Sequence, residues 1–182
     1  MLTYVAFLRG INVGGHNKLN MKDLVQLFEN LSFKNIKTYI QSGNVIFQSN
    51  SSNNTNYISQ HIENEIYKHF NFQVPVIIRT IDDLQNIVNT KPFSNITTVS
   101  DLLYVTFLQN SANIELLDKI NIEQYLPDKF KLINKEIFID CVNYGTTKLT
   151  NNFFENKLKV AATTRNMNTI NKIIELSLDI SN

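Results

Sequence analysis

Apolar residues along this chain occur in short β-prone runs that alternate with longer stretches of helical periodicity. Residues 2–9, LTYVAFLR, form a continuous apolar run that predicts a buried strand. Residues 20–31 carry apolar side chains at helical spacing behind Asn20, a suitable N-cap. The other elements of the first half are predicted as two strands within 35–49 that turn at Ser42–Gly43, a helix over 57–69, a strand over 74–80 and a helix from Asp82 or Asp83 to Val88. Their order is β-α-β-β-α-β-α.

The second half repeats this order. YVAFLR at residues 4–9 and YVTFLQ at residues 104–109 share four of six residues at an offset of 100. The elements that follow are predicted as a helix over 114–120, two strands within 130–142 that turn at Asn134–Lys135, a helix over 150–158, a short strand over 160–165 and a closing helix over 167–178. A repeated order of elements indicates an internal duplication.

A β-α-β-β-α-β unit is ferredoxin-like. We therefore predict an α+β fold made of two ferredoxin-like units in tandem, with largely antiparallel sheets. The first half covers residues 1–90, and the second half, with its closing helix, covers residues 102–182. Residues 91–101, which contain Pro92 together with Thr and Ser, are the predicted linker.

Composition and charge narrow the class of protein. The 182 residues are 43% hydrophobic and 18% charged, which is typical of a globular domain and argues against disorder. The net charge of +1 argues against a strong non-specific affinity for DNA. The single cysteine, Cys141, excludes an intramolecular disulfide and fits a reducing compartment. No apolar run approaches the roughly 18 residues of a membrane span, and the first residues lack signal-peptide features, so we expect a cytoplasmic protein without membrane contact.

The first polar cluster is the loop LRGINVGGHN, residues 8–17. Its glycines have the spacing of a P-loop from Gly10 to Gly15, but His16 and Asn17 stand where Lys and Ser or Thr are required, and GxGxxG fails as well. Two interpretations stay open. The loop and the helix behind it bind an anion through backbone N–H groups, or the glycines form a structural turn with positive φ.

The second cluster is YIQSGN, residues 39–44, which alone reads as a hairpin turn with polar flanks. In a ferredoxin-like unit the first and third strands are antiparallel neighbours, so Arg9 and Asn44 are expected at the same edge of the sheet. The 41–44 turn would then add amide and hydroxyl groups to a guanidinium suited to carboxylate or phosphate.

The third cluster is TTRNMN, residues 163–168. Its simplest interpretation is a helix cap by Asn166 or Asn168, with Arg165 solvated; its alternative is part of a binding site.

Other candidate side chains have simpler interpretations. His61 and His69 read as solvated or boundary residues of one helix, and Cys141 as a core thiol. No metal-ligand spacing, Ser-His-Asp set or carboxylate pair is present, so no metal is predicted, cofactors and catalytic residues stay unassigned, and enzymatic activity stays open.

Three motifs, LRGINVGGHNKLNM, TYIQSGNVIF and YGTTKLTNNFFENKL…ATTRNMNT, resemble the DUF1697 family of bacterial proteins of unknown function. The resemblance implies an α+β fold with duplicated ferredoxin-like halves, but no chemistry. Two residues depart from the family pattern: Met167 stands where Trp is typical, and Lys159 where Gly is usual, while His16 lies at a variable position. The resemblance implies these motif positions: Arg9, Gly10, Asn12, Gly14, Gly15, Asn17, Gln41, Ser42, Gly43, Asn44, Lys148, Arg165, Asn166, Asn168 and Thr169.

The leading hypothesis is a site for a small anionic or polar ligand, a nucleotide or a phosphorylated metabolite, at the 9–18 loop and the 41–44 turn. The residues expected to bind it are Arg9, Asn12, Gly14, Gly15, Asn17, Gln41, Ser42, Asn44, Lys148, Arg165, Asn166 and Asn168.

Two alternatives remain. One is an RNA-binding module, although SGNVIFQS lacks the RNP1 pattern, and Tyr4 and Phe7 point to opposite faces of their strand. The other is a protein-interaction module, with a homo-oligomer as one form.

Overall fold

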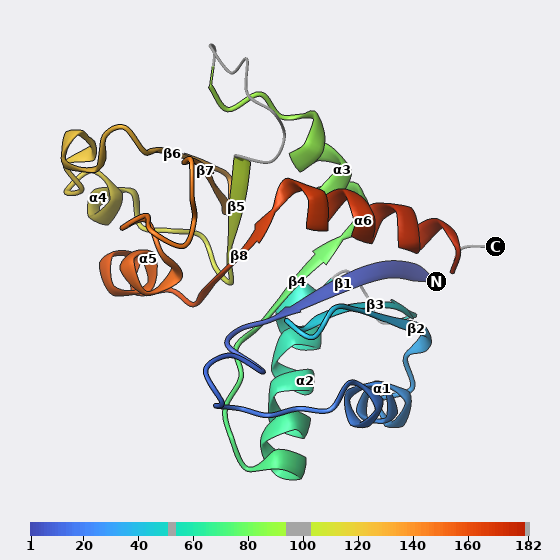
Figure 1. The fold of residues 1–182 in the computed structure, drawn as a ribbon. Coiled ribbons are helices and arrows are strands. Elements are labelled where there is room, and N and C mark those ends of the chain that lie inside the picture. The colour runs from blue at the N-terminus through green and yellow to red at the C-terminus, as the bar shows by residue number, and fades with distance from the viewer. Residues whose placement is uncertain (51–53, 94–102, 181–182) are drawn as a thin grey trace. The chain divides into compact units, whose positions relative to one another are not determined.

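The computed structural model describes residues 1–50, 54–93 and 103–180, and it contains two four-stranded antiparallel sheets (Figure 1). Contacts divide the chain into a first unit, Met1–Ile87 with Lys172–Asn182, and a second unit, Val88–Asn171. Each unit holds one of the two sheets.

The first half has the predicted order of elements. Its helix α2 starts slightly earlier than expected because the side chain of Asn54 caps it, accepting a hydrogen bond from the backbone N–H of Tyr57. The same helix ends at Asn71, whose left-handed φ of 58° stops it. The elements are β1 (Leu2–Leu8), α1 (Met21–Asn30), β2 (Lys34–Tyr39), β3 (Asn44–Ser49), α2 (Thr55–Phe70), β4 (Val76–Thr80) and α3 (Ile81–Asn89).

The second half follows the same order with one correction. The helix predicted over 114–120 ends at Leu117, and a 3₁₀ helix that the pattern did not predict follows it; a side-chain oxygen of an asparagine, Asn113 or Asn121, caps each. The elements are β5 (Leu103–Leu108), α4 (Ile114–Leu117), η2 (Ile122–Tyr125), β6 (Lys129–Ile133), β7 (Glu136–Asp140), α5 (Asn151–Leu158), β8 (Ala162–Asn166) and α6 (Met167–Leu178).

The strand orders confirm the predicted duplication of ferredoxin-like units. The first sheet has the order β2-β3-β1-β4 and the second β6-β7-β5-β8, and all neighbours are antiparallel. The registers also match, because Phe7 pairs with Asn44, the first residue of β3, where Phe107 pairs with Glu136, the first residue of β7.

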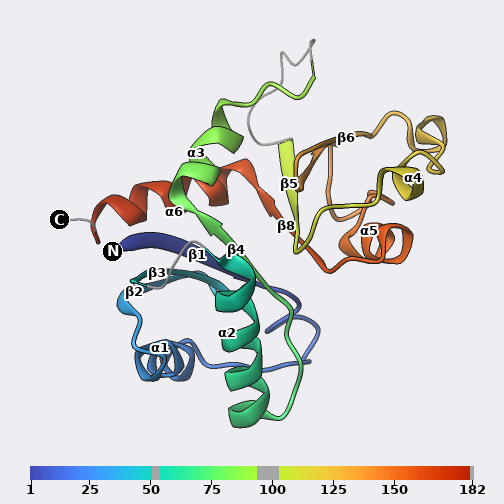
Figure 2. The same cartoon turned by 180° about the vertical axis from the view of Figure 1, so that it is seen from behind.

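Helices α1 and α2 lie on one face of the first sheet (Figure 1, Figure 2). Alternate residues of β1, among them Tyr4 and Ala6, pack with these helices in one core cluster. Val5 and Phe7 point to the opposite face and are buried as well. A strand buried on both faces reads as the continuous apolar run seen in the sequence.

The end of the chain belongs to the first unit by its contacts. Beyond α6, Asp179 accepts a hydrogen bond from the ammonium of Lys37 at 2.7 Å, and this bond holds the pKa of the Asp179 carboxyl below its usual value.

The predicted linker lies mostly outside the described residues, so the division of the chain at residues 91–101 stays a prediction.

Two tyrosines differ in how their hydroxyl groups are satisfied. Tyr4 is fully buried, its hydroxyl has no hydrogen-bond partner among the described residues, and burial raises its pKa. In the second unit, the Tyr144 hydroxyl donates to the Thr164 hydroxyl at 2.9 Å, which in turn bonds the hydroxyl of Thr106. An unpaired buried hydroxyl destabilises the folded state, whereas a paired one contributes to its stability.

We therefore predict opposite effects for two matched substitutions. Tyr4→Phe removes an unpaired polar atom and should raise the free energy of unfolding by about 1 kcal/mol, whereas Tyr144→Phe should lower it by about 1 kcal/mol. Urea unfolding of both variants measures the difference. Equal losses in the two variants would show that the Tyr4 hydroxyl is hydrogen-bonded in solution.

Candidate functional site

The glycine loop and the 41–44 turn lie together at one edge of the first sheet, as predicted. The backbone N–H of Leu8 donates to the carbonyl of Gly43 at 2.8 Å, and the side-chain amide of Asn12 donates to the carbonyl of Gln41 at 3.0 Å. The connection between α2 and β4 reaches the same edge, because the N–H of Arg9 donates to the carbonyl of Pro75 at 2.9 Å.

The glycine pair of the loop forms a tight turn. The N–H of His16 donates to the carbonyl of Val13, and the two central residues have φ values of 60° at Gly14 and 80° at Gly15, which is typical of a type I′ turn. Glycine therefore has a structural reason here. The backbone N–H groups of Gly14 and Gly15 make no hydrogen bond within the described part of the chain, so the same turn presents two donors.

Gly43 holds the turn against the loop. Its φ is 81°, and a Cβ atom there would lie 2.7 Å from Cβ of Leu8 and 2.8 Å from Cδ1 of Ile11. Only glycine permits this approach without displacement of its neighbours.

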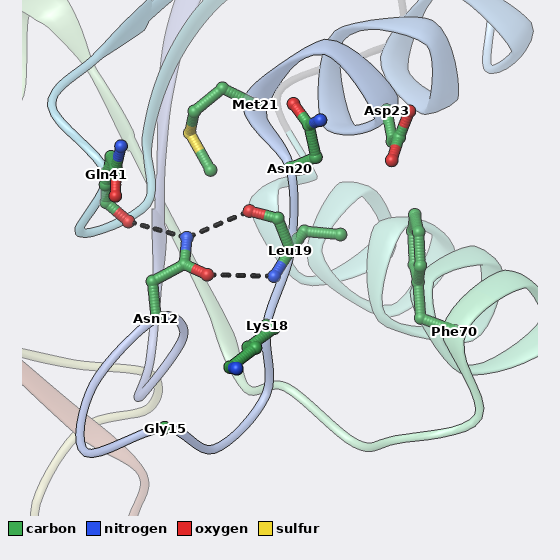
Figure 3. A pocket seen from close by; sticks show the side chains of 9 residues that line it. All are labelled: Asn12, Gly15, Lys18, Leu19, Asn20, Met21, Asp23, Gln41 and Phe70. Atoms are coloured by element: carbon green, nitrogen blue, oxygen red, sulfur yellow. Dashed lines mark hydrogen bonds between the residues drawn. The ribbon is translucent and has the colours of Figure 1, made fainter.

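A pocket of about 820 Å³ lies beside the loop (Figure 3). Lys18 supplies a cation from the loop, Asp23 a carboxylate from the first turn of α1, and Phe70 an aromatic ring from the end of α2. No ion pair within the described residues includes Lys18. The lining residues are Asn12, Gly15, Lys18, Leu19, Asn20, Met21, Asp23, Gln41 and Phe70.

Asn12 shapes this pocket with its side chain (Figure 3). Its amide donates to the carbonyl of Leu19 at 2.9 Å as well as to Gln41, and its oxygen accepts from the N–H of Leu19 at 2.8 Å. Both amide hydrogens are used within the fold, so Asn12 contributes by fixing the loop.

Asn17 and Asn44 also use their amides within the fold. Asn17 donates to the carbonyl of Gly10, and the fully buried Asn44 donates to the carbonyl of Tyr39 and to the hydroxyl of Ser42. These residues hold the loop and the turn in place.

The sequence prediction and the pocket overlap only partly. Asn12, Gly15 and Gln41 line the pocket. The other predicted residues of the loop and the turn lie at the same edge but outside the lining: Arg9, Gly14, Asn17, Ser42 and Asn44. Lys18 belongs to the predicted loop but was not among the predicted binding residues. Sequence reasoning also missed Leu19, Asn20, Met21, Asp23 and Phe70. The position of Phe70 in the last turn of α2, just before the connection that returns to this edge, is the signal that could have found it.

The other predicted site residues lie in the second unit. Arg165 is buried rather than solvated: its Nη1 donates to the Thr163 hydroxyl at 2.8 Å and to the carbonyl of Thr164 at 2.9 Å. Asn166 caps α6, as one interpretation predicted, by accepting from the N–H of Thr169 at 2.8 Å. Lys148 and Asn168 are exposed.

The two departures from the family pattern also lie in the second unit. Met167 is only 5% exposed, which favours a packing role at this position. Lys159 ends α5 with a left-handed φ of 57°, a conformation that a glycine adopts without strain.

The remaining histidines of α2 and the cysteine lie outside the lining of this pocket. His61 and His69 are exposed on α2, and Cys141 is buried, which raises the pKa of its thiol to about 11 and makes it a poor nucleophile. Within the described ranges, no three His, Cys, Asp or Glu side chains are grouped as metal ligands, and no helix is long and apolar enough to cross a bilayer.

Comparisons with known proteins give a family and a fold. A family model described as "Protein of unknown function (DUF1697)" matches residues 1–138. Conserved bacterial protein SP0830 from Streptococcus pneumoniae has a similar structure, with a TM-score of 0.74 and 21% sequence identity over 97% of this chain and 98% of that one. No curated protein matches the chain.

The fit of Gly43 predicts a difference between two glycine substitutions. Gly43→Ala combines positive φ with two close contacts and should lower the free energy of unfolding by about 3 kcal/mol. Gly10→Ala, where φ is 70° but no atom lies within 4 Å of the added carbon, should cost only about 1 kcal/mol. Urea unfolding compares them, and equal losses would contradict the close approach at Gly43.

Proposed function

The chain belongs to the DUF1697 family of proteins of unknown function, and we propose that it binds a small anionic or polar ligand, a nucleotide or a phosphorylated metabolite, beside the glycine loop. The pocket beside the glycine loop is the proposed binding site. Lys18 and Gly15, which line the pocket, recognise the anionic group together with the N–H of Gly14, the other glycine of the turn.

The observation that carries this proposal is a difference between the two units. Twelve residues (9–20) connect β1 to α1, whereas five (109–113) connect β5 to α4. Four residues (40–43) connect β2 to β3, whereas two (134–135) connect β6 to β7. The second unit therefore forms the same fold with shorter connections at both places.

The surrounding backbone is the same in both units. The N–H of Leu8 donates to Gly43 where the N–H of Leu108 donates to Lys135. The N–H of Arg9 donates to Pro75 where the N–H of Gln109 donates to Ala161. The shared sheet and its backbone hydrogen bonds do not require the longer β1–α1 and β2–β3 connections of the first unit. Both longer connections meet at the pocket, which supports a binding role for them.

The chemistry of the lining supports an anionic ligand. Adjacent N–H groups in a turn bind anions, and an ammonium group adds a charge-assisted hydrogen bond. Besides Lys18, Asp23 is the one charged residue of the lining, and no His or Cys lies there as a general base or nucleophile. We therefore assign binding and no reaction.

A nucleic-acid function receives less support. Tyr4, Phe7 and Phe47, the aromatic residues of the two central strands of the first sheet, are fully buried, so they cannot stack on bases.

Thermal unfolding against a ligand panel tests the proposal. The panel contains inorganic phosphate, nucleotides, phosphorylated sugars, carboxylates and a short single-stranded RNA at low and moderate salt. A ligand at 100 times its Kd should stabilise the chain by about 2.7 kcal/mol, which raises Tm by several degrees. Lys18→Gln should remove most of this shift, and Arg9→Ala should reduce it because its guanidinium adds positive charge at the same edge.

Lys22→Gln is the matched control, because Lys22 lies exposed on α1 outside the lining. A ligand-induced rise in Tm that is as large in Lys18→Gln as in Lys22→Gln would contradict the proposed site. A shift with RNA alone that fades with salt would instead indicate a nucleic-acid function, and no shift with any ligand would indicate a protein partner.

A further inference from the structure

We infer that the ligand of this pocket carries a planar heterocyclic ring in addition to its anionic group, so that it is a nucleoside phosphate and not a ring-free phosphorylated metabolite. This inference rests on the proposed function and narrows the ligand class of the same site.

The two charged side chains of the pocket orient the ligand. Gly15 and Lys18 come from the glycine loop, whereas Asp23 comes from α1 and Phe70 from the end of α2 (Figure 3). A phosphate is attracted by the loop and repelled by the Asp23 carboxylate. The anionic group therefore belongs at the loop, and the neutral part of the ligand extends toward the two helices.

Two apolar side chains of the lining, Met21 of α1 and Phe70 of α2, offer surface to a ring. Phe70 and Met21 are partly buried, pack against the core of the first unit and line the pocket with their remaining surface. An aromatic side chain in the lining favours a planar ligand, because a base stacks on its ring. Gln41 and Asp23 add polar groups that can accept hydrogen bonds from ring nitrogens and amino groups.

The volume of the pocket agrees with this class. At about 820 Å³ it lies in the range of sites for drug-sized molecules, roughly 300–1,000 Å³. An inorganic phosphate or a small carboxylate would leave the surface of Phe70 and Met21 in water.

Isothermal titration calorimetry of the full chain tests the inference with three kinds of probe, which differ in whether they carry the base or the phosphate. These are a set of 5′-nucleoside monophosphates, ribose 5-phosphate without the base, and the nucleosides without the phosphate. We expect the preferred nucleoside monophosphate to bind at least tenfold more tightly than ribose 5-phosphate, and the nucleoside to bind weakly.

Variants at Phe70 test recognition of the ligand's ring separately from recognition of its anionic group. Phe70→Leu should remove most of the preference for the nucleotide without changing the affinity for ribose 5-phosphate, and Phe70→Tyr, which keeps a ring, should retain it. Phe72→Leu is the control, because Phe72 packs on the same core with its ring 6.0 Å from that of Phe70 but does not line the pocket. Lys18→Gln should weaken the binding of both phosphates.

The outcomes are distinguishable. Equal affinities for the nucleotide and ribose 5-phosphate, both unchanged in Phe70→Leu, would overturn the ring inference and leave the anion site standing. A nucleotide preference that Phe72→Leu reduces as much as Phe70→Leu would also overturn it. Absence of binding by any phosphate would overturn the proposed function itself.

Discussion

The side-chain amide of Asn12 is the interaction on which the pocket depends. It closes the glycine loop on itself through both the N–H and the carbonyl of Leu19, and it joins the loop to the neighbouring turn through the carbonyl of Gln41. Three hydrogen bonds from one side chain hold three backbone groups of two residues, Leu19 and Gln41. Asn12 thus joins the parts of the lining that the loop and the turn contribute.

The duplication supplies an internal comparison for this arrangement. Where Ala6 pairs with Ile78 in the first unit, Thr106 pairs with Thr164 in the second and joins a network of hydroxyl groups. Where Asn44 closes the long turn, Glu136 begins its strand after a two-residue turn. The antiparallel frame is thus shared, while the polar side chains and the loop lengths differ at the sheet edges.

The two arginines of this frame show the same relation. Arg79 pairs with Val5 and Arg165 with Val105, both are buried, and each donates Nη1 to the carbonyl of the residue before it. The shared local geometry indicates that Arg165 is part of the duplicated frame. This argues against a ligand-binding role for Arg165. The sequence had favoured a solvated side chain, whereas the structure buries it.

Sequence patterns predicted the strands and their order because apolar runs and turn residues are local signals. The proximity of the two loops could also be predicted, since the ferredoxin-like topology places them at one edge. The roles of Asn12 and Asn44 could not, because an amide that binds a ligand and one that bonds a distant carbonyl look alike in a sequence. Phe70 was missed because the predicted helix ended at residue 69, although the connection that follows α2 returns to this edge.

The hydrogen-bond donors of the glycine loop that are not used within the fold limit how it can bind a ligand. The amides of Asn12, Asn17 and Asn44 are used to hold the backbone. In the proposed site, recognition of an anion would therefore fall to the N–H groups of the glycine turn and to Lys18. Backbone donors are fixed in position before the ligand arrives, which lowers the entropy lost on binding. A flexible lysine beside a rigid turn would recognise charge more than shape, so in the proposed site discrimination among anions would come from the rest of the lining, where Asp23 and Phe70 lie.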